Sequence, residues 1–205
     1  LASNALTTAA SVIFSPSGGI FNGEPGTIDL NGAFALSGGT FTAPGRLVEG
    51  GPQGVMNFND NFTVSGTGNF VHNNGALIFD GATKFIDVVN PLDLYDFEVK
   101  TTSLAYMGIT AGDTVIVNGA STLTNGTLYC PSGTAVLNAK GASSIAATFD
   151  GGHMAGSPHL LIDGSGNQSF TIPDGAVMLK TVLNNPLATI TATAGLNGSI
   201  SPSGA

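Results

Sequence analysis

Short runs of alternating apolar and polar residues recur along the chain, each after a bulky apolar residue and a glycine. In FNGEPGTIDL, Phe21 and Gly26 precede the alternating pair Ile28 and Leu30, and FVHNNGALIF repeats this arrangement. Such alternation predicts a short strand with one buried face, and the intervening glycine and asparagine residues predict turns. In the five copies of this unit, the bulky residue and the glycine are Phe21 and Gly26, Phe41 and Gly45, Phe70 and Gly75, Leu128 and Gly133, and Phe170 and Gly175.

A unit of this size has too little apolar area to fold alone, so successive units must stack on one another. Parallel stacking places equivalent strands about 4.8 Å apart, with Phe, Leu, Ile and Val inside and Thr, Ser and Asn in water. A looser copy, from Met107 through Gly112, and the uneven spacing of the glycines indicate an irregular period. The sequence therefore predicts an all-β protein, a parallel β-solenoid or β-helix with irregular coils of roughly 20–30 residues.

Domain boundaries follow from where this pattern weakens. We expect residues 1–187 to form the β-solenoid repeat domain and residues 188–205 to form a C-terminal strand or the start of a further β module. Residues 85–107 alternate only partly and are expected to be extended, whereas residues 149–170 are glycine-rich and are expected to contain a protruding loop. Neither terminus shows a polar helix or a charged cap, so we expect continuation into neighbouring domains or head-to-tail pairing of end strands.

Composition narrows the classes of partner. Only 9% of the 205 residues are charged, and the formal net charge is −8. Five basic residues cannot form the cationic surface that nucleic acid or an anionic membrane requires. No apolar run approaches the roughly 20 residues of a membrane span, so we expect no membrane insertion. The single cysteine, Cys130, excludes an intrachain disulfide.

Acidic residues are the first candidates for chemistry. Asp87, Asp93, Asp96 and Glu98 form the only local acidic cluster, and in a strand Asp96 and Glu98 would share one face. Glycoside hydrolysis needs two carboxyl groups roughly 5–10 Å apart around a sugar. The sequence favours a solvated acidic edge over this role, because it has no tryptophan to stack on a sugar ring. We therefore expect no catalytic residues.

Metal and cofactor sites are weakly indicated. A calcium site at Asp87, Asp93 or Asp96 is a candidate, although the chain lacks the spaced carboxylates of a known calcium loop. His72, His153, His159 and Cys130 are too scattered to predict a zinc site. The glycines of GSGN and GTGN do not precede a helix, so they are interpreted as turns and not as phosphate loops. We expect the protein to need no cofactor.

Three longer phrases carry a resemblance. GTIDLNGAFALSGGTF, GTGNFVHNNGALIFDG and LLIDGSGNQSFTI resemble the degenerate repeats of large secreted bacterial β-solenoid proteins, including adhesin-like surface proteins. The terminal ITATAGLNGSISPSG is similar to the opening of small β-rich modules in bacterial extracellular proteins. The resemblance implies export, repetition and a location outside the cell or at the bacterial cell surface.

Three functions follow as hypotheses. The first is a structural protein, a stalk, matrix or filament subunit whose partners are further copies of itself or neighbouring domains of a larger chain. The second is an adhesin module that binds a glycan or a host surface through a solenoid face or the 149–170 loop. The third is a polysaccharide-degrading β-helix enzyme that uses the acids of residues 87–98. We favour the structural protein and expect the chain not to be an enzyme.

Overall fold

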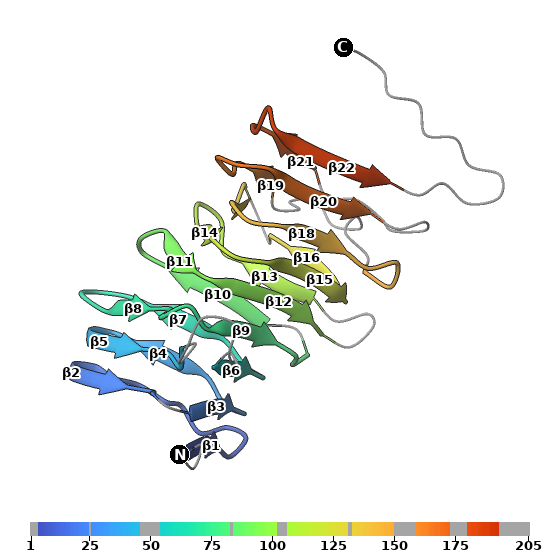
Figure 1. Ribbon diagram of the computed structural model, residues 1–205. Helices are drawn as coiled ribbons and strands as arrows, with labels where there is room; N and C mark the ends of the chain where they lie inside the picture. The colour runs from blue at the N-terminus through green and yellow to red at the C-terminus, as the bar shows by residue number, and fades with distance from the viewer. Residues whose placement is uncertain are drawn as a thin grey trace.

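The computed structural model describes residues 4–24, 26–45, 54–82, 84–101, 106–130, 133–149, 159–172 and 180–192. All strand pairs in these residues are parallel, and none of these residues lies in a helix. The chain winds into a β-solenoid of about seven turns, with β1 and β22 at opposite ends of the stack (Figure 1). The predicted all-β parallel solenoid is therefore confirmed.

Two sides of the solenoid are continuous sheets. Sheet A contains β1 (Asn4–Thr8), β3 (Gly26–Leu30), β6 (Val55–Phe58), β9 (Ala76–Phe79), β12 (Asp96–Lys100), β15 (Ser121–Asn125), β18 (Ser143–Ile145), β20 (Gln168–Ile172) and β22 (Ala188–Ala192). Sheet B contains β4 (Phe34–Leu36), β7 (Phe62–Val64), β10 (Lys84–Val88), β13 (Tyr106–Ile109) and β16 (Thr127–Tyr129). Isolated bridges at Phe14 and Phe149 extend sheet B by one winding at each end.

The third side is divided between two sheets. Sheet C contains β2 (Ser17–Asn22), β5 (Gly38–Thr42) and β8 (Asn69–Val71), all from the first windings. Sheet D contains β11 (Leu92–Leu94), β14 (Thr114–Val117), β17 (Val136–Ala139), β19 (His159–Ile162) and β21 (Thr181–Leu183). The strand ladder of this side is thus interrupted between β8 and β11.

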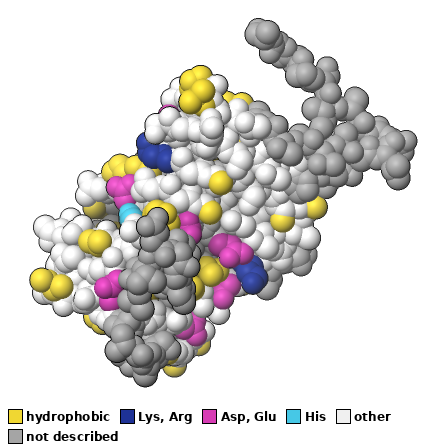
Figure 2. Space-filling model, viewed as in Figure 1, with side chains coloured by type: hydrophobic (Ala, Val, Ile, Leu, Met, Phe, Trp, Pro, Cys, Tyr) yellow, Lys and Arg dark blue, Asp and Glu magenta, His cyan; other side chains and the backbone are white. Residues whose placement is uncertain are grey.

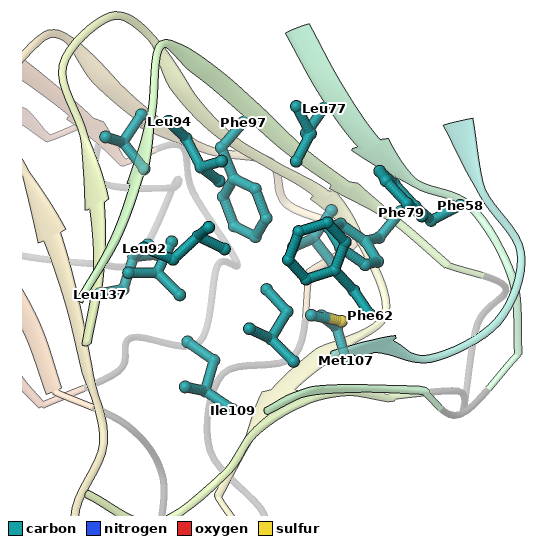
Figure 3. Packing of buried hydrophobic residues seen from close by; sticks show 14 of the residues in the cluster. Phe58, Phe62, Leu77, Phe79, Leu92, Leu94, Phe97, Met107, Ile109 and Leu137 are labelled. Atoms are coloured by element: carbon teal, nitrogen blue, oxygen red, sulfur yellow. The ribbon is translucent and has the colours of Figure 1, made fainter. Parts of the chain in front are cut away.

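Side chains in register fill the interior. In sheet A the pairing places Ile28, Met56, Leu77 and Phe97 in one column of successive windings, and all four are buried. Figure 3 shows residues of sheets A, B and D pointing into the same space, where they form one continuous core. Because the strands are parallel and in register, each apolar side chain packs on its equivalent in the next winding.

Phenylalanines of the third side confirm the stacking expected from the sequence. Phe21, Phe41 and Phe70 occupy equivalent positions of β2, β5 and β8. The Phe21 and Phe41 ring centroids lie 4.8 Å apart, and those of Phe41 and Phe70 lie 5.8 Å apart. Both pairs are nearly parallel and match the spacing of the windings.

The corner that follows this column requires glycine at Gly75. A Cβ atom at that position would lie 1.9 Å from the carbonyl oxygen of Pro44 in the preceding winding. The two residues before it, Asn73 and Asn74, have φ angles of 51° and 59°, in the left-handed region that asparagine tolerates better than most residues. The HNNG turn predicted between the two strands is therefore a close contact between windings.

The repeat assignment needs two corrections. Gly54, not Gly45, is the equivalent of Gly26 and Gly75, because the register pairs Thr27 with Val55 and Val55 with Ala76. Leu128 belongs to sheet B and Phe170 to sheet A, so neither extends the Phe21 column. Every corner joins two strands through a turn, so different corners look alike in sequence.

One of the looser matches is correct. Leu128 and Gly133 are equivalent to Met107 and Gly112, since Met107 pairs with Leu128 and both glycines have positive φ. Gly175 lies outside the described residues.

The lengths of the coils agree with an irregular solenoid. The register step along sheet A is 28 residues from Thr27 to Val55 and 20 residues from Ala76 to Asp96. The described residues of the 85–107 segment are extended, as expected, and contribute to β10, β11, β12 and β13. Residues 150–158, where the protruding loop of the 149–170 segment was expected, lie outside the described residues. At the C-terminal end, β22 pairs with β20, so residues 188–192 continue sheet A, and residues 193–205 lie outside the described part.

Candidate functional site

Two of the predicted acidic residues lie together on the outer face of sheet A. Asp96 and Glu98 share one face of β12, as their spacing predicted, and both are half-buried. They border a shallow depression of about 260 Å³. Its lining includes the apolar side chains of Val55, Ala76 and Ile78 from the two preceding windings.

Both carboxylates make hydrogen bonds to the following winding. Asp96 Oδ1 accepts a hydrogen bond from the Ala120 N–H at 2.6 Å, and Glu98 Oε1 accepts one from Thr124 Oγ1 at 2.7 Å. Charge-assisted hydrogen bonds of this kind are stronger than neutral ones. The two acids therefore join β12 to the segment around β15, which gives them a structural role.

The three calcium candidates are on different sides of one winding. Asp87 is exposed on β10 of sheet B, Asp93 is exposed on β11 of sheet D, and Asp96 is on β12 of sheet A. Within the described ranges, no group of three or more His, Cys, Asp or Glu residues could hold a metal ion. The structure does not bring the three aspartates together.

The remaining chemical candidates are also dispersed. His72 lies at the corner between β8 and β9 and stacks on Tyr95, with ring centroids 6.0 Å apart. Burial lowers the pKa of the His72 imidazole, and the Asp93 carboxylate opposes this shift. Cys130 is buried just after β16, His159 begins β19, and His153 lies outside the described residues.

The first described winding has an apolar end. Leu6, Phe14 and Phe21 face the core but are only partly buried, because they have a neighbouring winding on one side. A depression of about 170 Å³ opens beside Leu6, Phe21 and Ile28. The same winding exposes three large apolar side chains, those of Val12, Ile13 and Ile20, the last with 84% of its surface in water.

The last described winding also exposes apolar residues. Leu183 occupies the same interior column as Ile162 and Ala139, which are fully buried, yet 48% of the Leu183 surface is exposed. Val182 and Leu187 in the same winding are exposed as well. Leu183 therefore has the position of a core residue without the burial of one.

Charged side chains at the two ends are few and opposite in sign. Glu24 is the one charged residue of the described segment 4–24, and Lys180 is the one charged residue of the described segment 180–192. Both are exposed. Figure 2 shows that charged groups are similarly sparse on the visible surface, most of which is neither charged nor hydrophobic. Glu24 also accepts a hydrogen bond from Asn73 Nδ2, which lies two windings further along the chain.

Comparisons with protein-family models, with curated proteins and with solved structures find no match to this chain. Among the residues that the structure describes, no helix is long and apolar enough to cross a membrane.

Sequence reasoning did not identify the partly exposed core-facing residues of the first and last described windings. Ile20 is not one of these residues, because it occupies an outward position of β2 on the side of the solenoid; its exposure depends on the strand register, which the sequence alone does not fix. The run VIF at residues 12–14 was a usable signal, because it is apolar without the alternation of a half-buried strand. Leu183 could not be recognised, since it has the same pattern as buried residues elsewhere in sheet D.

Proposed function

We propose that this protein is a structural scaffold, a β-solenoid stalk, matrix or filament subunit located outside the bacterial cell, that stacks end to end through its terminal strands. The observation that carries the proposal is the apolar surface at both ends of the described solenoid. Core-facing residues are partly exposed there, whereas most of their equivalents in the windings between are buried.

The strand geometry supports this mode of assembly. β1 and β22 are the two outer strands of sheet A, so each has one edge that pairs with no described strand. Unpaired edges of this kind readily accept a strand from another chain. If β1 of one copy pairs in parallel with β22 of another, sheet A continues through the junction. Phe21 of one copy then covers Leu183 of the other on the third side.

Such a contact joins two different surfaces, and each outermost copy keeps one free end because the copies stack along a single axis. A heterologous contact produces an open filament when the rotation between successive copies does not bring the chain of copies back to its start. The resulting rod would be continuous in its backbone hydrogen bonds and its apolar columns, which makes it stiff without disulfides or cofactors.

Sedimentation velocity at increasing protein concentration tests the proposal. The wild-type chain is expected to form species that lengthen with concentration, whereas Leu183→Lys is expected to remain monomeric because it places a charge in the junction. Val89→Lys is the matched control, since Val89 is equally apolar and 61% exposed but lies on the side of the solenoid. Wild-type protein that stays monomeric throughout, or assembly that survives Leu183→Lys, would contradict the proposal.

A further inference from the structure

The third side of the solenoid contains a notch where one winding is shorter than both of its neighbours. The chain takes seven residues, 89–95, to pass from β10 of sheet B to β12 of sheet A. It takes eleven residues in the winding before, 65–75, and eleven in the winding after, 110–120. The short winding therefore cannot reach as far outward as the windings on either side of it.

The interruption between sheets C and D lies at this notch. β8 and β11 belong to successive windings, yet they are not in the same sheet. Pro91 directly precedes β11 and has no N–H to donate, so it cannot extend a ladder toward β8. A depression of about 180 Å³ remains between the two segments.

The floor of the notch is the edge of the core. Val64 of β7 and Val88 of β10 line it and have 8% and 6% of their surface exposed, whereas most residues of the core are almost fully buried. Phe70, which is half-buried, and Leu92 complete the apolar part. A ligand in the notch would therefore meet a small apolar floor, to which the half-buried Phe70 contributes most.

Polar side chains surround this apolar floor. Asn69 lies on the β8 side, and Asn90 and Asp93 lie on the β11 side; all three are exposed and line the depression. Two amides and a carboxylate offer hydrogen-bond donors and acceptors to a ligand with several hydroxyl groups. Neither lysine nor arginine lines the notch, so no cation there would compensate an anionic ligand beside Asp93.

We propose that the notch between β8 and β11 binds one neutral sugar ring of a glycan. A pyranose has an apolar C–H face that suits the exposed part of Phe70, and peripheral hydroxyls that suit the amide and carboxylate groups around it. The volume is below the roughly 300–1,000 Å³ of pockets for drug-sized ligands, so it fits a single ring better than an oligosaccharide. The negative charge of Asp93 selects against uronic acids and other anionic sugars.

Nuclear magnetic resonance titration of the whole chain tests this site. Neutral methyl glycosides of glucose, galactose and mannose are the probes, and methyl glucuronide is the anionic counterpart. At least one neutral glycoside is expected to shift amide resonances at residues 68–71 and 90–93, and methyl glucuronide is expected to bind more weakly. No shifts up to the solubility limit of every glycoside, or shifts centred on another part of the chain, would overturn the proposal.

Variants of the rim decide whether the polar groups recognise the ligand. Asn90→Ala and Asp93→Ala are each expected to weaken binding about three- to tenfold, the value of one lost hydrogen bond. Both side chains are exposed, so the fold is expected to be unchanged, and the thermal unfolding midpoint checks this. Asn57→Ala, on the outer face of sheet A, is the matched control and is expected to bind as the wild type does. Equal affinity of the rim variants and the control would contradict the assignment.

The site is independent of end-to-end assembly. The Leu183→Lys variant is expected to bind the sugar with unchanged affinity, because Leu183 lies in the last described winding and the notch lies between β8 and β11. Loss of binding in this variant would show that the sugar is held at a junction between copies and not in the notch.

Discussion

From Phe14 to Phe97 the interior of the solenoid is dominated by phenylalanine rings, whereas from Ser121 to Phe170 it includes buried serine and glutamine. All but two of the phenylalanines in the core belong to the first of these regions. Phe34 alone has ring contacts with five others, including a stacked contact with Phe62 at 4.9 Å. Aromatic stacking between windings therefore holds the N-terminal region together.

The C-terminal region follows the same winding with a different interior. Ser121 and Ser143 occupy the sheet A column between Phe97 and Phe170, and their hydroxyl oxygens lie 3.3 Å apart. Gln168 is buried and makes four hydrogen bonds that connect three segments of chain. Its Nε2 donates to the carbonyl oxygens of Ala139 and Gly141, and its Oε1 accepts from the Gly164 N–H and Asn185 Nδ2.

This difference shows that the winding does not depend on one kind of interior. The parallel backbone ladder of sheet A continues without interruption from the phenylalanine columns to the serine pair. Backbone hydrogen bonds set the spacing of the windings, and side chains then stabilise that spacing either by apolar contact or by complete hydrogen bonding. The two regions should consequently respond differently to substitution.

The largest expected effect is in the phenylalanine region. Phe34→Ala is expected to reduce the free energy of unfolding by about 3–5 kcal/mol, because it leaves a cavity among five rings. Windings of a solenoid contact mainly their neighbours, so the loss should be local. Relative to the wild type, hydrogen exchange should accelerate more in β4 and β7 than in β17 and β19. Phe34→Leu, which keeps more of the volume, serves as the control, and equal acceleration in both regions would contradict the local account.

Gln168→Leu is expected to have the next largest effect, a loss of about 2–4 kcal/mol. The leucine is apolar and of similar size, but it removes the hydrogen bonds that the Gln168 amide makes to the Gly141 carbonyl oxygen and the Gly164 N–H, whereas the Ala139 carbonyl oxygen keeps the Asp163 N–H. Chemical denaturation measures the total loss, and hydrogen exchange should place it in β17, β19 and β20. A loss below about 0.5 kcal/mol, the range of ordinary surface substitutions, would show that Gln168 is not important to the C-terminal interior.

The serine pair should contrast with Gln168. Replacing both Ser121 and Ser143 by alanine removes a donor and its acceptor together, so neither is left unsatisfied. The double variant is expected to unfold within about 1 kcal/mol of the wild type. A double-mutant cycle with the two single variants measures the coupling between the hydroxyl groups. A loss as large as that of Gln168→Leu would mean that the hydroxyls make further buried contacts.

The smallest expected effect concerns pH at the turn after β13, where Asp113 Oδ2 accepts a hydrogen bond from the Val88 N–H at 2.8 Å. Burial raises the pKa of Asp113, the Val88 hydrogen bond lowers it, and the Asp87 carboxylate raises it. The folded protein therefore holds this proton more tightly than the unfolded chain. Its stability falls as pH rises from the ordinary value of 3.8 through the raised pKa.

Asp113→Asn removes this titration. The free energy of unfolding of the variant, relative to that of the wild type, should rise between about pH 3 and about pH 7. The rise should be less than about 0.5 kcal/mol, because the carboxylate is partly exposed to water. Thermal unfolding of both proteins at the two pH values measures the difference. If the variant were more stabilised relative to the wild type at low pH, or equally so at both pH values, Asp113 would not lower the stability of the wild type as pH rises.

The general architecture could be predicted from the sequence, but the exact register could not. Alternation after Phe21 and Phe70 identified strands and turns, because a two-residue period and glycine corners have a direct physical cause. The position of Gly54 was missed, because the residues between β5 and β6 lengthen that coil and shift the true equivalent away from Gly45. Turn length at corners is set by local packing, which a pattern of single residues does not encode.

The candidate sites were less predictable for a similar reason. The shared face of Asp96 and Glu98 followed from strand geometry, whereas their hydrogen bonds to Ala120 and Thr124 depend on which winding lies next to β12. The notch depends on the lengths of three successive windings, and these are known only after every strand is assigned to a sheet. Asp93 was noticed for its charge, but its place beside Asn90 at the notch required the fold.

X-ray fibre diffraction from an aligned, concentrated sample tests the central claim most directly. Stacked parallel windings along one axis should give a strong reflection at about 4.8 Å along the fibre direction. Head-to-tail stacking of chains with nine strands in sheet A should add a longer axial repeat of about 40 Å. A sample that cannot be aligned because the chains stay monomeric, or a pattern without the long repeat, would contradict end-to-end assembly. A pattern without the 4.8 Å axial reflection would contradict the axial stacking itself.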